Sequence, residues 1–82
     1  MRVIPKIRYL AQTAVDQMAD ELRSRYGGMM KLVDIQKELG LQKAAAMRWA
    51  NGLRYVEINN RKKYLVADVA EKICSSIRTE QQ

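Results

Sequence analysis

Residues 30–66 read MKLVDIQKELGLQKAAAMRWANGLRYVEINNRKKYLV, and this stretch decides the fold. Its first part repeats apolar residues at the three- and four-residue steps of a helix, whereas its last part alternates at every second residue, as a strand does. Gly40 and Gly52 stand where the helical steps break off, and glycine is typical of a helix end. The stretch therefore predicts two short helices that meet at a glycine turn, followed by a pair of strands.

The two short helices are expected within residues 30–52, and the helical pattern of the first reaches back to Met29. Strong helix formers fill most of the second. The positions spaced for burial are Leu32, Ile35, Leu39, Ala45, Ala46 and Trp49. Trp49 is the largest of them, so we expect it to anchor the second helix in the core.

The pair of strands is expected over residues 54–66, as a hairpin with a tight turn at Asn59-Asn60. Asparagine tolerates the positive φ that such a turn requires. Arg61, Lys62 and Lys63 follow at once, which makes the tip of the hairpin strongly basic. Because strand side chains alternate, Arg61 and Lys63 are expected to point one way and Lys62 the other.

Amphipathic helices are expected on both sides of this unit. Residues 5–26 begin at a proline, which suits the first turn of a helix, and stop before a glycine pair that can close it. Residues 67–78 carry Asp68 in their first turn, where a carboxylate is favourable. The apolar stripe of the N-terminal helix consists of Ile7, Leu10, Ala11, Ala14, Val15, Met18 and Leu22. Since 82 residues suffice for only one core, we expect residues 1–82 to form a single domain, mainly α with a small β-hairpin.

Positive charge gathers in the middle of the chain. Fifteen Lys and Arg face nine Asp and Glu, which gives a formal net charge of +6. Eight of those fifteen cations, but only three of the nine carboxylates, lie in residues 29–66. Localised basic charge is typical of a surface that contacts phosphates, so a polyanionic partner is expected.

The residue types of common catalytic and metal sites are missing or isolated. The chain has no His and a single cysteine, Cys74, which is expected to be a buried reduced thiol on the last helix. These residues supply neither a zinc site nor a nucleophile with its base, so we expect no metal, no cofactor and no enzymatic activity. No stretch approaches the roughly 20 apolar residues of a membrane span, and the first residues lack the apolar core of a signal peptide. A cytoplasmic protein is therefore expected.

The order helix, glycine turn, helix, basic hairpin and helix resembles the excisionase and MerR-type winged helix-turn-helix family. The resemblance is carried by LVDIQKELGL at residues 32–41, MRW at 47–49, RKKYLV at 61–66 and DV at 68–69. In that family the second helix enters the major groove of double-stranded DNA, and the hairpin wing touches the neighbouring backbone or the minor groove. The resemblance implies a nucleoid-associated protein of a bacterium or phage. Its role would be that of an accessory factor in the recombination of a mobile element or of a small transcriptional regulator.

Two features depart from the family pattern. Lys31 stands where the family commonly has a Ser or Thr N-cap, and an ammonium group cannot accept the backbone hydrogen bonds that a cap accepts. The run of alanines at residues 44–46 replaces polar side chains that read bases in many relatives.

The candidate DNA contacts are Lys43, Ala44, Arg48, Asn51, Arg61, Lys62 and Lys63. The first four share the outward face of the second helix with Met47. Arg48 can pair with a guanine through two hydrogen bonds or grip a phosphate, whereas Lys43 is better suited to phosphate. Ala44 can touch the methyl group of a thymine.

The alternative is a protein-interaction or dimerisation module. The helix over residues 5–26 lies outside the unit that carries the resemblance, and its apolar stripe can pack on the domain or make a partner interface. This alternative allows three kinds of partner: an integrase or recombinase, a second copy of the chain, or an acidic protein that meets the basic patch. The sequence leaves these possibilities open.

Overall fold

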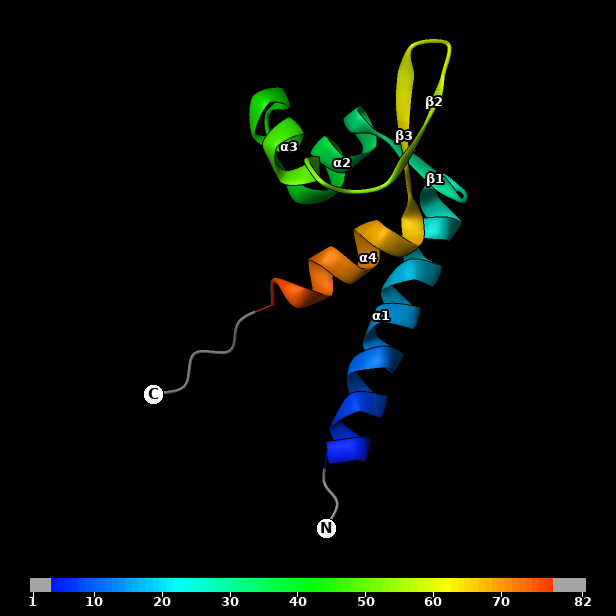
Figure 1. The fold of residues 1–82 in the computed structure, drawn as a ribbon, viewed down its shortest axis with the longest axis vertical. Helices are drawn as coiled ribbons and strands as arrows, with labels where there is room; N and C mark the ends of the chain where they lie inside the picture. The colour runs from blue at the N-terminus through cyan, green and yellow to red at the C-terminus, as the bar shows by residue number, and fades with distance from the viewer. Residues whose placement is uncertain (1–3, 78–82) are drawn as a thin grey trace.

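Four helices and one three-stranded antiparallel sheet make up the part of the chain that the computed structural model describes, which is the backbone of residues 4–77 and the side chains of residues 12–77 (Figure 1). In chain order the elements are α1 (Ile4–Tyr26), β1 (Met29–Lys31), α2 (Leu32–Leu39), α3 (Lys43–Ala50), β2 (Tyr55–Ile58), β3 (Arg61–Leu65) and α4 (Val66–Ser75). The expectation of a small, mainly α-helical fold with a β-hairpin is confirmed.

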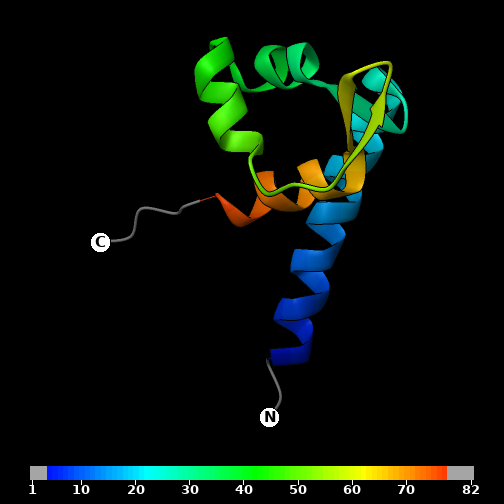
Figure 2. The same cartoon turned by 45° about the horizontal axis from the view of Figure 1, so that its top comes forward.

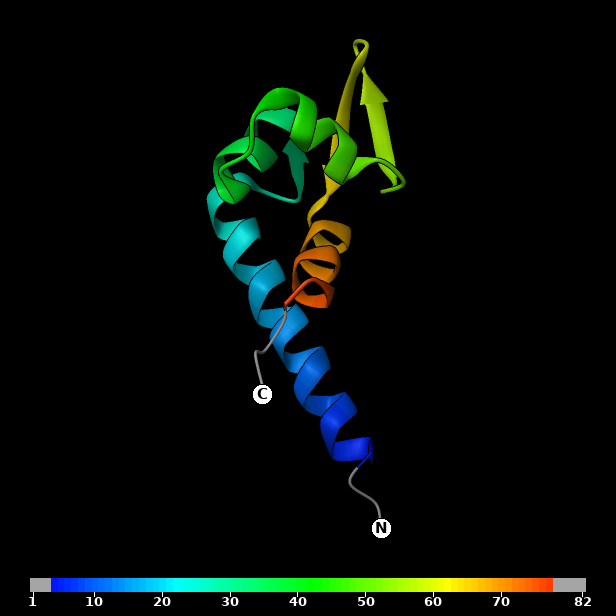
Figure 3. The ribbon, with the colours of Figure 1, turned by 90° about the vertical axis from the view of Figure 1, so that its left-hand side faces the viewer.

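Helix α1 is the element expected over residues 5–26. Its C-terminal half lies along α4, where Leu22 is fully buried and Val15 and Met18 pack against the core. Its N-terminal half runs on past α4, away from the other elements (Figures 1 and 3). The side chains of Ile7, Leu10 and Ala11 lie outside the described residues. The part of the apolar stripe that is described therefore packs partly on the domain.

Strand β1 corrects the expected helical pattern, which reached back through residues 29–31. Its three residues pair antiparallel with β3, so that Met30 lies opposite Tyr64. A positive φ of 88° at Gly27 turns the chain at the end of α1 and brings these residues to the free edge of β3. Three residues are too few to display a period, and here strand pairing overrides the helix propensity of methionine.

Helix α4 also departs from its expected bounds, residues 67–78, because it begins at Val66 and ends at Ser75. The Val66 N–H donates to the Gly28 carbonyl at 3.1 Å, which ties the start of α4 to the loop before β1. At the other end the Ser75 and Ser76 hydroxyls both donate to the Lys72 carbonyl, at 3.0 and 2.8 Å. Serine side chains that bond to the backbone in this way compete with continued helix.

The start of α2 is stabilised in spite of Lys31 at its N-cap. The Asp34 carboxylate accepts a hydrogen bond from the Lys31 backbone N–H at 3.0 Å, which is the half of a capping box that an acidic third residue can supply. The helix ends at Gly40, whose φ of 66° and ψ of 35° are left-handed. The Leu41 N–H then bonds to the Gln36 carbonyl at 3.0 Å, and this closure turns the chain directly into α3.

The core is mainly aliphatic, with Tyr64 as its buried aromatic residue, and part of it lies where α4 crosses α1 (Figure 2). Its fully buried large side chains are Leu22, Met30, Ile35, Val66 and Val69. Each of α1, β1, α2 and α4 contributes at least one of them, so the fold depends on a small shared cluster. The expected burial of Trp49 and Cys74 is met only in part, since both side chains are half-buried.

Met30→Ala should lower the free energy of unfolding by roughly 2–5 kcal/mol, because it deletes a fully buried side chain. Met29→Ala is the matched control on the neighbouring residue, which is 37% exposed and should change stability by no more than about 0.5 kcal/mol. Urea denaturation followed by circular dichroism measures both. Equal losses for the two variants would contradict the placement of β1.

Candidate nucleic-acid interface

A groove separates α3 from the hairpin formed by β2 and β3. We call it the α3–hairpin groove. One wall carries Lys43, Met47, Arg48 and Asn51, the other carries Tyr55, Glu57, Asn60, Arg61, Lys62 and Tyr64, and Lys31, Leu32 and Val33 lie at the end nearest α2. The groove thus joins the two segments in which the sequence placed the candidate contacts.

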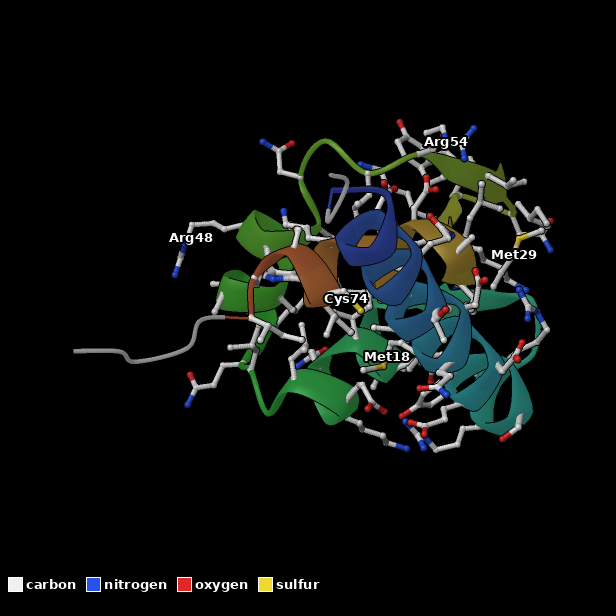
Figure 4. All side chains as sticks on the ribbon, turned by 90° about the horizontal axis from the view of Figure 1, so that it is seen from below. Met18, Met29, Arg48, Arg54 and Cys74 are labelled. Carbon is white, nitrogen blue, oxygen red and sulfur yellow. The ribbon has the colours of Figure 1, made fainter. Side chains whose placement is uncertain are left out.

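The α3 wall follows from helical spacing. Ala46 and Ala50 are buried and Ala45 and Trp49 are half-buried, so the opposite side of α3 faces outward. The exposed residues on that side are Lys43, Ala44, Met47, Arg48 and Asn51, as expected. Arg48 points away from the body of the molecule (Figure 4). Ala44 is exposed but does not line the groove.

The hairpin wall follows from the turn and the strand register. Asn59 and Asn60 adopt φ values of 54° and 63°, the left-handed pair of a two-residue turn. Tyr55 then lies opposite Tyr64 and Glu57 opposite Lys62, and all four side chains line the groove. Alternation turns the other residues of the two strands to the far face of the sheet.

The basic run at the hairpin tip is divided by this alternation. Lys62 lines the groove, and its ammonium nitrogen lies 4.7 Å from the centre of the Tyr55 ring. Lys63 lies opposite Val56 on the far face and does not line the groove. Arg61 shares that face by register, but its place beside the turn lets it line the groove as well. The structure therefore brings Lys43, Arg48, Asn51, Arg61 and Lys62 together and leaves Lys63 outside.

Positive charge dominates the groove. Its ionisable lining residues are Lys31, Lys43, Arg48, Arg61, Lys62 and Glu57. Within residues 12–77, none of the five cations forms an ion pair with a carboxylate. Charges that repel one another in this way favour a polyanion between the two walls.

Negative charge gathers on another face, in a crevice between α1 and α4. Its charged lining residues are Asp16, Asp20, Asp68, Glu71 and Arg23. The two faces carry charges of opposite sign, so the electrostatic field of the molecule has a direction. Such a field steers a polyanion in solution toward the groove.

Helix α4 holds both walls of the groove through side chains one turn apart. The Asp68 carboxylate accepts two hydrogen bonds from Arg54, at 2.8 and 2.9 Å, and so fixes the chain that leads into β2. The Lys72 ammonium donates to the carbonyl of Trp49 in the last turn of α3 and lies 4.9 Å from the centre of the indole ring. A cation is favourable at a helix C-terminus. These contacts tie both walls of the groove to α4.

Sequence reasoning missed several of these residues. Lys31 and Tyr55 line the groove, and Arg54 and Lys72 position its walls. Alternation counted from the Asn59-Asn60 turn could have put Tyr55 on the same face as Lys62. Nothing in the sequence signals the contacts of Arg54 and Lys72, because their partners lie 14 and 23 residues away.

Other kinds of site find little support in the described part of the chain. It holds no group of three or more His, Cys, Asp and Glu residues that could bind a metal ion. Among its helices, none combines the length and the apolar character that crossing a membrane requires.

The chain was compared with known proteins by family, by sequence and by fold. No protein-family model matches it, and neither a curated protein nor a solved structure does.

Arg54→Ala should lower the melting temperature at neutral pH, because it removes both hydrogen bonds to Asp68. Those hydrogen bonds hold the pKa of Asp68 below its ordinary value, against the opposing effect of burial. The stabilisation is therefore fully present above the ordinary pKa of an aspartate and is lost as the pH falls through the lowered pKa. Thermal melts of both proteins across the acidic range should converge at the lowest pH.

Arg23→Ala is the control, because it removes an ion pair with Asp20 in which both side chains are at least half exposed. It should change the melting temperature little at any pH. A stability difference for Arg54→Ala that stays constant down to strongly acidic pH would contradict the role of the Asp68 pair.

Proposed function

We propose that this chain binds double-stranded DNA as a winged helix-turn-helix protein, with α3 as its recognition helix and the β2–β3 hairpin as its wing. The observation that carries the proposal is the α3–hairpin groove, whose two walls both carry cations that form no ion pair within residues 12–77. DNA offers phosphates on both sides of the major groove, so an inserted α3 and a wing beside it meet opposite charges.

The arrangement of the elements supports this assignment. Helices α2 and α3 meet at Gly40, the hairpin and α3 lie on opposite sides of α2 (Figure 1), and α4 lies below them in the view of Figure 2. The outward face of α3 is free of contacts with the core, as a helix that enters the major groove must be. Excisionase and MerR-type proteins, which the sequence resembles, combine the same elements, and this resemblance supports the proposal.

The groove residues then take separate roles. Lys43 on one wall and Arg61 and Lys62 on the other neutralise phosphates and hold the protein in register. Arg48 and Asn51 are the α3 side chains that can form two hydrogen bonds with one base, with guanine and adenine respectively. Ala44 and Met47 add apolar contact with thymine methyl groups. Affinity therefore comes mainly from the backbone of the DNA and discrimination from few residues.

The biological setting that fits is a mobile element or phage. There the chain acts as an accessory factor beside an integrase or recombinase, or as a small transcriptional regulator. Both roles use the same DNA contacts and differ in which protein occupies the neighbouring site.

A second candidate function, a protein-interaction module, is favoured by the N-terminal half of α1, which runs past the rest of the molecule (Figure 1). In that case the chain binds an acidic protein and has little affinity for random duplex DNA. Gel shifts with random duplexes at increasing salt separate the two functions, because only DNA binding gives a strongly salt-dependent shift.

Lys62→Ala should weaken binding to every duplex alike, since the wing positions the protein without reading sequence. The slope of log affinity against log salt concentration should be near −4 to −5 for the unchanged chain if about five phosphates are neutralised, and should become shallower by about 1 in the variant. Fluorescence anisotropy with a labelled duplex measures both quantities.

Lys63→Ala is the matched control, because it removes an adjacent cation of the same type that lies on the far face of the sheet. Its affinity and its slope of log affinity against log salt should stay closer to those of the unchanged chain than the values for Lys62→Ala do. Equal losses would show that the groove does not distinguish the two lysines and would overturn the assigned wing contact.

Arg48→Ala should bring a selected binding site and a scrambled one closer together in affinity. Losing one bidentate base contact costs roughly 1–3 kcal/mol of discrimination, which corresponds to about 5- to 150-fold. Lys43→Ala on the same wall should lower both affinities by similar factors. If Arg48→Ala also lowers both equally, Arg48 only grips a phosphate, and the assigned base reading is wrong.

A further inference from the structure

Strand β2 is an open edge of the sheet. The strand order is β1-β3-β2, and all four residues of β2 are exposed. Natural edge strands are commonly blunted by shortness, by charged residues, above all lysine, by proline or by a bulge, and of these β2 has only its four-residue length and Glu57. Strand β2 reads YVEI, and its register with β3 runs without a bulge. Val56 and Ile58 are 38% and 44% exposed, so the open edge also carries apolar side chains.

We propose that β2 pairs with β2 of a second copy of this chain, antiparallel, about a two-fold axis at Val56. The two three-stranded sheets then form one continuous sheet. Pairing at a sheet edge is a common way in which one chain recognises another.

The backbone of β2 is suited to this register. In a hairpin closed by a two-residue turn, the residues that flank the turn bond to each other, and bonded residues then alternate along the strand. Ile58 and Val56 therefore bond to β3, while Tyr55 and Glu57 turn their backbone groups to the open edge. With Val56 on the axis, Tyr55 lies opposite Glu57 of the second copy, and each such pair can exchange two hydrogen bonds.

The side chains of the two edges complement each other in the same register. Glu57 is the one carboxylate of residues 54–66. It would lie opposite Tyr55 of the second copy, over whose ring the Lys62 ammonium is already placed at 4.7 Å. An axis at Glu57 would instead put two carboxylates directly opposite each other, which is unfavourable. Charge therefore favours the Val56 register over the one centred on Glu57.

This register has a consequence for DNA binding that rests on the proposed function. Directly opposed residues of an antiparallel pair project from the same face of a sheet. Because Val56 opposes Val56, both copies present the groove face, with Tyr55 and Lys62, on the same side of the joined sheet. A dimer of this kind can place both α3–hairpin grooves on one duplex, as symmetric DNA-binding proteins do.

The dimer is expected to be weak. A four-residue edge buries much less than the roughly 800 Å² per partner of a stable complex. The average mass in solution should therefore rise with protein concentration from the 9.5 kDa of one chain toward twice that value.

Cysteine cross-linking tests the register. In a chain that also carries Cys74→Ala, Val56→Cys should form a disulfide-linked dimer under mild oxidation, because opposed Cα atoms at this position are about 4.5 Å apart. Ile58→Cys is the matched control two residues away. In this register the Cα atoms of the two Ile58 residues are four residues apart along the strands, about 13 Å, which is too far for a disulfide. The proposal is overturned if Ile58→Cys cross-links as strongly as Val56→Cys, or if neither variant cross-links.

Sedimentation of charge variants tests the interface in the otherwise unchanged chain. Val56→Lys puts like charges on the axis and should leave a monomer at every concentration. Met29→Lys is the control, because Met29 is 37% exposed on the same face of the sheet but at the opposite edge, and this variant should dimerise as the unchanged chain does. Dimerisation that resists Val56→Lys, or an unchanged chain that stays monomeric at the highest soluble concentration, overturns the proposal.

The same measurements keep this inference separate from the proposed function. An unchanged chain that binds duplex DNA with strong salt dependence but never dimerises contradicts the β2 pairing alone. An unchanged chain that dimerises through Val56 but ignores DNA supports the pairing and contradicts the proposed function.

Discussion

The burial of Tyr64 is the constraint on which the arrangement of this molecule depends. Tyr64 lies in the central strand β3, opposite Met30 on one side and Tyr55 on the other, and is only 7% exposed. Once that side chain faces the core, strict alternation decides which face of the sheet each of the remaining residues of β3 points to. Lys62 must face the groove, and Lys63 must face away from it. A shift of the register by one residue would exchange the two lysines and bury a charge.

Helix α4 converts this local constraint into a site with two walls. It follows β3 without a loop, so the direction of β3 also sets the direction of α4. Asp68 and Lys72, one helical turn apart, then hold the chain before β2 and the end of α3. The apolar face of the same helix, on which Val69 and Ala70 are fully buried, packs against α1 and the sheet. Stability and the geometry of the groove are therefore coupled through one ten-residue helix.

The distribution of charge has the same origin. Carboxylates of α1 and α4 line one crevice, and the cations of α3, β3 and the end of β1 line the other side of the fold. In the chain these charges are interleaved, since Asp34 and Glu38 lie between Lys31 and Lys43. Folding separates them because Asp34 caps its own helix and Glu38 accepts hydrogen bonds from Arg25 and Tyr26 of α1. The groove is left with a single carboxylate, Glu57.

Local patterns in the sequence determined most of the elements and the outward face of α3. Helical steps, Gly40 and the Asn59-Asn60 turn act over a few residues, so the two short helices, the hairpin and the exposure of Lys43 and Arg48 could be read without the fold. Only the tertiary structure decided the rest. Strand β1 forms because it pairs with the edge of β3. Lys62 and Lys63 point to opposite faces of the sheet because Tyr64 is buried. Lys72 contacts Trp49, which lies 23 residues away in the chain. Those contacts join segments far apart in the chain, and no local spacing encodes a partner that folding alone brings near.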